Sequence, residues 1–252
     1  MLKSKIGAGL ISFVFVIGAW QLVIWIGGYQ EALLPSPLAV GRAIFSLIED
    51  GTLFAHLQVS LFRFFIGYIT AVLTGIILGL ILGRTPKVWA VADPIVQVLR
   101  PVAPVAWTPF IVLWFGIGNI PAIAIIFIAA FFPVLLTTVS AVRKVPDNYL
   151  KTAINLEIRG PTLLWKVIFP ASFPSIANGL HIAVGTAWIF LVAGEMVGAQ
   201  SGLGYLIIDS RNALDLDFVV AGIVFIGLLG LALDKGVGSI ERAILKQWGG
   251  VY

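Results

Sequence analysis

The stretch RKVPDNYLKTAINLEIRGPTLLWKVIFP, from Arg143 to Pro170, is a polar interruption in a strongly apolar chain. It holds five Lys or Arg residues and two Asp or Glu residues, although charged residues make up only 11% of the whole chain. Long apolar blocks lie on both sides of it. The pattern predicts membrane helices joined by a connection that stays outside the bilayer.

The composition places the chain in the membrane class. Of its 252 residues, 60% are hydrophobic and the mean hydropathy is +1.05, which leaves too little polar surface for a water-soluble globule. A bilayer core about 30 Å thick is crossed by roughly 20 apolar residues, so the length allows about six spans with short loops. We expect an all-α membrane protein of one domain, residues 1–252, without a sizeable soluble part.

The composition also excludes several kinds of site. The chain has no cysteine, and its two histidines, His56 and His181, are far apart in sequence. A disulfide framework, a thiolate nucleophile and a Cys/His metal site are therefore not expected. The sequence has no G-x-x-x-x-G-K-[ST] phosphate loop, so this chain is not expected to bind ATP. The net charge of +4 reflects basic loops rather than a nucleic-acid surface.

Each apolar block is predicted to be a helix, because lipid offers no partner to unpaired backbone groups. The expected spans are residues 6–27, 56–83, 88–116, 120–142, 171–198 and 218–238. The first span follows the basic flank MLKSK and is longer than a signal-peptide core, so it is expected to be retained. GxxxG spacing, as at Gly75, Gly79 and Gly83, suits close packing of helices.

The distribution of Lys and Arg orients these spans. The basic residues that fall on one side are Lys3, Lys5, Arg84, Lys87, the five of the 143–170 stretch, Arg242 and Lys246. The positive-inside rule makes this side cytoplasmic and places both termini there. Pro101, Pro104 and Pro109 predict that the third block is broken or kinked, either as a packing feature or as the wall of a translocation path.

The 143–170 stretch has the punctuation of two short helices. Pro146 and Asp147 can begin the first and Gly160 with Pro161 can end it, while the second is expected over residues 162–169, ending at Pro170. Leu150, Ala153, Ile154, Glu157 and Ile158 share one face of the first helix, and Lys151, Asn155 and Arg159 lie on another. The stretch is either a basic loop that only sets topology or a docking surface for a cytoplasmic partner.

At these residues the sequence resembles the inner-membrane permeases of binding-protein-dependent ABC importers. Their signature runs EAA, three residues, G, nine residues, I, one residue, LP. Here Lys151-Thr152-Ala153 stands at EAA, Glu157 at the glycine, and Val167 to Pro170 at I-x-LP, so the spacing is kept while Lys151, Thr152 and Glu157 depart from the signature. In the family the glycine permits close approach at the ATPase contact.

Other stretches extend the resemblance from about Leu33 to Leu245. LLPSPLAV near Pro35, DPIVQVLRPVAPVAWTPFIVLWFGIG from Asp93 and GEMVGAQSGLGYLI from Gly194 resemble the nitrate, sulfonate, taurine and bicarbonate branch. The resemblance implies a type I importer permease fold in a prokaryotic inner membrane. Implied partners are a second permease subunit, two ATPase subunits that carry ATP and Mg²⁺, and an extracytoplasmic binding protein. Asp147, Lys151, Ala153, Glu157, Gly160 and Pro170 would then couple this chain to the ATPase.

Charged residues inside apolar blocks are costly and are normally paired or face a cavity. They occur here as Arg63, Asp93, Arg100, Glu195 and Asp234. Arg63 and Glu195 fall at comparable depth near the predicted outer face, so we expect an ion pair near an outer gate; direct contact of Arg63 with substrate is the alternative. Trp107, Thr108, Gln200 and Ser201 are candidates for lining an oxyanion path.

Two other classes of protein are weighed against the importer. An ion-coupled secondary transporter would have broken helices in two related halves, and only the third block is visibly broken. A membrane enzyme would need converging acids, bases or metal ligands, and no such spacing is present. A permease for another small solute of the same superfamily is a closer alternative.

Overall fold

The computed structural model describes residues 2–31 and 33–247, and every regular element in that part of the chain is helical. The prediction of an all-α protein is confirmed. The long helices are α1 (Leu2–Gly27), α3 (Thr52–Arg84), α6 (Asn119–Arg143), α9 (Phe169–Gly198) and α11 (Leu216–Gln247). The shorter ones are α2 (Pro37–Glu49), α4 (Pro86–Leu99), α5 (Thr108–Phe115), α7 (Asp147–Asn155), α8 (Gly160–Leu163) and α10 (Leu203–Ala213), with a 3-10 turn, η1 (Pro104–Trp107), and a π turn, η2 (Leu164–Ile168).

Four helical segments of the described chain are long and apolar enough to cross a membrane. They are Thr52–Arg84, Asn119–Arg143, Gly160–Gly198 and Leu216–Ile244. The pair Pro86–Leu99 and Pro104–Phe115 meets the same test together and would be a fifth span. The first predicted span, residues 6–27, lies on α1, in which Val14–Gly27 is a shorter apolar helix.

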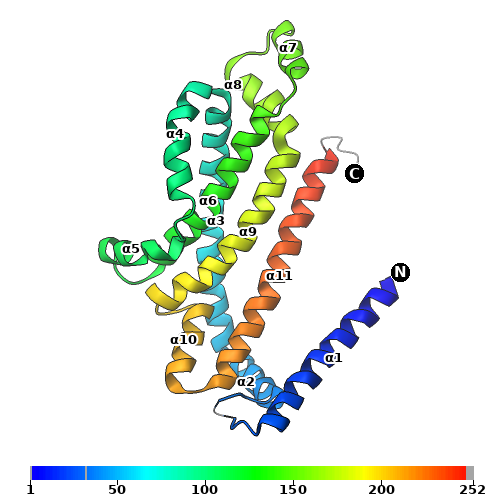
Figure 1. Ribbon diagram of the computed structural model, residues 1–252, viewed down its shortest axis with the longest axis vertical. Coiled ribbons are helices and arrows are strands. Elements are labelled where there is room, and N and C mark those ends of the chain that lie inside the picture. Colours follow the sequence, from blue (N-terminus) through cyan, green and yellow to red (C-terminus); the bar gives the residue numbers. More distant parts are fainter. Residues whose placement is uncertain (1, 32, 248–252) are drawn as a thin grey trace.

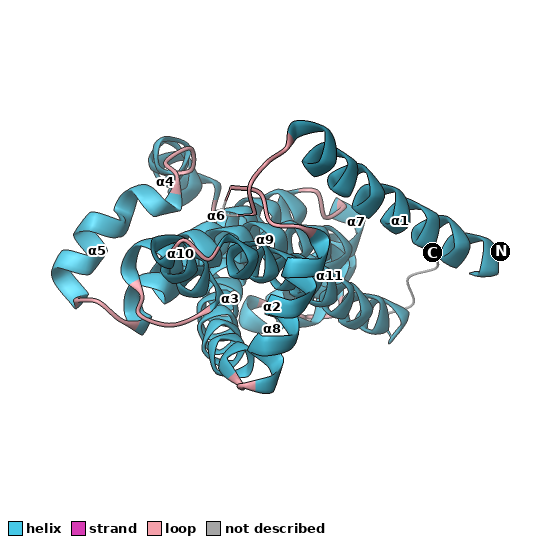
Figure 2. Cartoon of the chain, turned by 90° about the horizontal axis from the view of Figure 1, so that it is seen from below, coloured by secondary structure: helices cyan, strands magenta, loops and turns pink. Residues whose placement is uncertain are grey.

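The long helices α3, α6, α9 and α11 run side by side and form the body of the molecule (Figure 1). Helices α7 and α8 cap one end, which we call the α7 end, and α2 and α10 lie at the opposite end, the α10 end. Helix α1 leans away from this bundle and meets it through α2 (Figures 1 and 2). The core therefore sits between α3, α6 and α9, with α11 on one flank.

The third apolar block is broken where its prolines predict. Helix α4 ends at Leu99, and η1 and α5 follow after a bend of 87°. Pro104 lies at the start of η1 and Pro109 at the start of α5, where a missing backbone N–H costs no helical hydrogen bond. The expected break is confirmed, and α5 points sideways out of the bundle (Figure 1).

Small residues recur every four positions along α3 where it meets α6. All of them are buried: Gly67, Ala71, Gly75, Gly79 and Gly83. A methyl group at Gly79 would lie 2.5 Å from Thr138 Cβ, and one at Gly75 would lie 2.9 Å from Val134 Cγ1. The two helices approach this closely because the α3 side of the contact carries so little side chain. The packing role expected for the GxxxG spacing is confirmed.

Helix α6 packs equally closely on α9. Gly179 on α9 accommodates the side chain of Thr137, which a methyl group at that position would overlap. Pro133 lies within α6 without ending it. Proline lacks the N–H that would bond the carbonyl four residues earlier, and the Thr186 hydroxyl of α9 donates to that carbonyl, Ala129 O, at 3.3 Å. A side chain of α9 therefore replaces a hydrogen bond that α6 cannot make.

We predict that Gly79→Ala destabilises the fold by about 1 to 3 kcal/mol, because the added methyl group must displace Thr138 or separate α3 from α6. Gly227→Ala on α11 is the matched control, since a methyl group there meets nothing within 4 Å and alanine is the better helix former. Thermal unfolding of the purified protein in detergent distinguishes the two. Equal midpoints would contradict the close α3–α6 contact.

Candidate functional site

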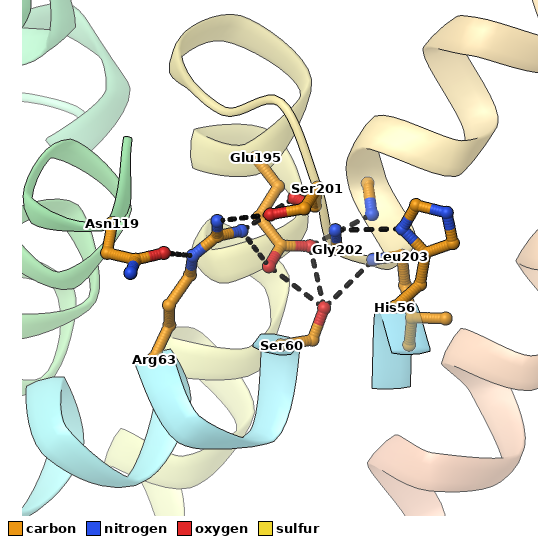
Figure 3. A network of polar contacts seen from close by, with 9 residues as sticks. His56, Ser60, Arg63, Asn119, Glu195, Ser201, Gly202 and Leu203 are labelled. Atoms are coloured by element: carbon orange, nitrogen blue, oxygen red, sulfur yellow. Dashed lines mark hydrogen bonds and ion pairs between the residues drawn. The ribbon is translucent and has the colours of Figure 1, made fainter. Parts of the chain in front are cut away.

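Arg63 of α3 and Glu195 of α9 form a buried ion pair at the α10 end of the bundle (Figure 3). Arg63 Nη1 lies 2.8 Å from Glu195 Oε1, and the two side chains are only 1% and 0% exposed. The predicted pairing is confirmed. A charged pair withdrawn from solvent to this degree is stable only if its remaining donors and acceptors are also satisfied.

The guanidinium of Arg63 has further partners at the start of α6 and in the loop before α10. Its Nε donates to Asn119 Oδ1 at 2.9 Å, and its two Nη atoms donate to the carbonyl and the hydroxyl of Ser201, at 2.6 and 2.8 Å. Asn119 begins α6, and Ser201 lies between α9 and α10. With these partners and almost no exposed surface, the guanidinium of Arg63 ties the start of α6 and the loop before α10 to α3.

The carboxylate of Glu195 completes the N-terminus of α10. Gly204 N–H donates to Glu195 Oε2 at 3.0 Å, and Leu203 N–H donates to Ser60 Oγ at 2.8 Å. Ser60 Oγ lies 2.9 Å from both carboxylate oxygens, and His56 Nδ1 accepts from Gly202 N–H at 3.0 Å. Side chains therefore satisfy the N–H groups that a helix leaves unpaired in its first turn, and a negative charge lies at its positive end.

Two glycines of the sequence GLG make this contact possible. Gly202 has φ +104°, a conformation that residues with a Cβ rarely adopt, and a methyl group there would overlap the Glu195 carboxylate. A methyl group at Gly204 would lie 2.5 Å from Val192 O. We call His56, Ser60, Arg63, Asn119, Glu195 and Ser201, with the backbone of Gly202 to Gly204, the polar node. It joins α3, α6, α9 and α10.

The other path candidates do not converge. Thr108 is 2% exposed, and its hydroxyl donates to Val105 O at 2.6 Å within the broken third block. Trp107 is partly buried and its ring lies beside that of Phe110. Gln200 is exposed beside the polar node, and Ser201 belongs to the node. Sequence reasoning missed His56, Ser60 and Asn119; Ser60, three residues before Arg63, lies on the same face of α3.

The 143–170 stretch forms a compact layer over the α7 end. Helix α7 is amphipathic: Ala153 is 3% exposed, and Leu150 and Ile158 pack with it against Leu80 of α3 and Val142 of α6. Ile154 and Glu157, expected on the same face as Ala153, are exposed instead; Glu157 lies beyond the end of α7 at Asn155. Lys151 also points to solvent, and Asp147 begins the helix as predicted.

Glu157 explains where α7 ends. Its φ is +60°, in the left-handed region that usually requires glycine at this position of a helix terminus. Glu157 N–H donates to Ile154 O at 3.0 Å, and Ile158 N–H donates to Ala153 O at 2.9 Å, which is the Schellman pattern. The glycine of the family signature therefore falls on a left-handed turn, and here a glutamate adopts it.

Two predicted ends of the short helices are wrong. Gly160 begins α8 and does not end the preceding helix, because Glu157 has already ended it. Pro170 does not end the second helix, because α8, the π turn η2 and α9 continue as one helical segment, Gly160–Gly198. The wider π turn immediately before Pro170 leaves room for a ring that would clash with the carbonyl four residues earlier in a regular α-helix.

We predict that Glu195→Gln lowers the free energy of unfolding by about 3 to 5 kcal/mol, because it leaves Arg63 buried without a counter-charge. The double variant Arg63→Leu with Glu195→Leu should lose less than the losses of Arg63→Leu and Glu195→Leu added together, which a denaturant titration of these three variants and the unaltered protein measures. Arg42→Ala removes an exposed cation from the same end and should change little. Additive losses would mean that Arg63 and Glu195 do not interact.

The Glu157 turn gives a second prediction. Glu157→Gly should protect the amides of α7 and α8 more strongly, by about 1 to 2 kcal/mol, because glycine adopts φ +60° without steric cost. Glu157→Val should weaken their protection, since a β-branched residue is least suited to this conformation. Hydrogen–deuterium exchange of peptides covering residues 147–168 reports both. Faster exchange in the glycine variant would contradict the left-handed turn.

Comparison with known proteins agrees with this architecture. Residues 71–246 match the family described as the binding-protein-dependent transport system inner membrane component. The putative aliphatic sulfonates transport permease protein SsuC of Bacillus subtilis is 34% identical over 97% of this chain and 88% of its own length. The nitrate import permease protein NrtB of Leptolyngbya laminosa is 35% identical over 94% of this chain and 87% of its own.

A solved structure shows the same fold. The MetNI methionine ABC transporter, in an inward-facing conformation, superposes with a TM-score of 0.65 at 20% identity, over 74% of this chain and 93% of the matched chain. The fold is thus that of an ABC importer permease, as expected from the sequence. With the family match over residues 71–246 and the two permeases similar along nearly their whole length, the chain belongs to the inner-membrane components of binding-protein-dependent transport systems.

Proposed function

We propose that this chain forms the pore of an ATP-driven importer for a small oxyanion of the nitrate or sulfonate class. The similar proteins are named for aliphatic sulfonates and for nitrate, and both ligands carry an anionic head of oxygen atoms. A membrane component of a transport system performs no reaction of its own, so ATP and Mg²⁺ belong to partner subunits and none is bound by this chain. The chain lies in a prokaryotic inner membrane, with both of its termini on the cytoplasmic side.

The observation that carries the proposed coupling to an ATPase is the surface of the 143–170 stretch. Its inner face is anchored on α3 and α6, while large apolar side chains face outward at the α7 end: Tyr149 is 55% exposed, Ile154 48%, Leu156 67% and Trp165 51%. Such a patch on a polar segment is typical of a protein-docking surface. A loop that only sets topology would not need it.

The assembly that we propose contains a second copy of this chain, two ATPase subunits on the α7 end and an extracytoplasmic binding protein on the α10 end. Asp147, Lys151, Ala153, Glu157, Gly160 and Pro170 shape the ATPase contact through the fold of the segment. The polar node, with Arg63 and Glu195, holds the gate region at the opposite end. Motion of the ATPases reaches the pore because the segment packs directly on α3 and α6 of the bundle.

The experiment is uptake of labelled nitrate or ethanesulfonate by cells in which the gene is deleted and then restored. Arsenate, which depletes ATP, should abolish uptake, while a protonophore should leave it largely intact as long as fermentation supplies ATP. Uptake that survives loss of ATP and follows an ion gradient would overturn the proposal in favour of a secondary transporter. The absence of anion uptake under all conditions would overturn the substrate class.

In the same cells, Ala153→Pro should abolish uptake and co-purification of the ATPase while the protein still inserts. Proline at this buried position removes a helical hydrogen bond and breaks α7. Asn148→Pro is the matched control, because it places proline in the first turn of the same helix, where it is tolerated. Normal uptake and assembly in the Ala153 variant would reduce the stretch to a topology loop.

A further inference from the structure

A hollow of about 760 Å³ runs along the seam between α6 and α9 at the α7 end. The end of α4 contributes Arg100 to its lining, and the end of α6 contributes Lys144. Among the described residues that line it there is no Asp or Glu. The volume falls within the usual range of small-ligand sites, and the lining gives the hollow a net positive charge. We call it the α6–α9 groove.

Both cations of the groove lack an ion-pair partner in the described part of the chain. Both are exposed. Asp93 lines an adjoining hollow together with Lys144, but its carboxylate accepts from Gln97 Nε2 at 3.2 Å and forms no ion pair. Two exposed cations without an ion-pair partner make one groove attractive to a small anion.

Small polar side chains line the wall between the two cations. Ser140 lies on α6, and Ser175 and Asn178 lie on α9. All three are exposed, and none of their side chains makes a hydrogen bond within the described chain. Hydroxyl and amide groups donate to oxyanions without adding charge, so they complement the cations without holding an anion too strongly for it to leave.

The groove is long enough to serve as a route. Along α6 its lining extends from Pro133 to Lys144, the residue after the helix ends, a rise of about 17 Å. On α9 it extends from Pro174 to Thr186, about 18 Å. Either distance is more than half of a bilayer core about 30 Å thick. The deep end lies at Arg100, beside the break that follows α4.

We infer that the α6–α9 groove is a binding site for a small oxyanion on its way through this chain, with Arg100 as the deep contact and Lys144 at the α7 end. This inference rests on the proposed function and names the surface that the substrate meets. Between the two cations the anion passes from one neutral hydrogen-bond donor to the next. These donors are the hydroxyl groups of Ser140 and Ser175 and the amide group of Asn178. None of these residues belongs to the polar node.

The absence of cysteine permits a direct test of the charge in the groove. Ser175→Cys places one thiol there, and its reaction rate is measured with an anionic sulfonatoethyl methanethiosulfonate and a cationic trimethylammonium-ethyl methanethiosulfonate on the purified protein. The anionic reagent should react faster, and Arg100→Gln should reduce its relative rate by about fivefold, the effect of one unit charge at close range in water. Lys87→Gln, which removes a cation at the other end of α4, should not. Ethanesulfonate or nitrate should slow the reaction only when Arg100 is present.

Uptake supplies the second measurement. Arg100→Gln should reduce anion uptake at least tenfold, while Arg100→Lys retains most of it and Lys87→Gln leaves it unchanged. Stimulation of ATP hydrolysis by the loaded binding protein should persist in Arg100→Gln, because the coupling segment is untouched. Modification of Arg100→Cys with aminoethyl methanethiosulfonate, which restores a cation, should recover uptake, and the anionic reagent should not.

The outcomes separate this inference from the proposed function. If the unaltered protein imports no anion, the proposed function fails. If it imports anions at the expense of ATP, but Arg100→Gln imports them equally well and the reagent preference at Ser175→Cys is unchanged, the groove inference alone fails. A loss of both uptake and ATPase stimulation in Arg100→Gln would also overturn it, since Arg100 would then act on assembly or coupling.

Discussion

The buried pair of Arg63 and Glu195 is the interaction on which the α10 end of the molecule depends. Neither side chain reaches solvent, so each hydrogen-bonding group around the pair must be matched within the protein. That requirement fixes the start of α6 through Asn119, the loop before α10 through Ser201, and the first turn of α10 through Glu195. A charge pair that adds little net stability by itself thereby determines how four helices meet.

The opposite end is fixed by packing and not by charge. The small residues of α3 let it lie close to α6, and the same two helices end in the apolar cluster that receives Ala153 of α7. Close-packed interiors transmit displacement because they have little free volume. A push on the α7 end is therefore expected to move α3 and α6 together, and through the polar node α10 as well.

Sequence reasoning reached the helical class, the break in the third block and the Arg63–Glu195 pair, because each follows from a local cost: unpaired backbone in lipid, proline in a helix, charge in an apolar block. It predicted the ends of the short helices in the 143–170 stretch at the wrong residues. Nothing in a single sequence indicates that Glu157 adopts a left-handed turn, or that a π turn lets α8 and α9 continue through Pro170. The groove between Arg100 and Lys144 also needs the fold, since α4, α6 and α9 supply its lining.

We expect α7 and α10 to move as parts of one rigid body, and spin-label distances within one chain test this most directly. The absence of native cysteine allows labels at the exposed positions Asn155 and Asn212, one at each end of the bundle, with the other permease copy unlabelled. In the complete transporter, the distance distribution between them should be single, narrow and unchanged between the nucleotide-free and ATP-bound states. A shifted, broadened or divided distribution on ATP binding would contradict the claim.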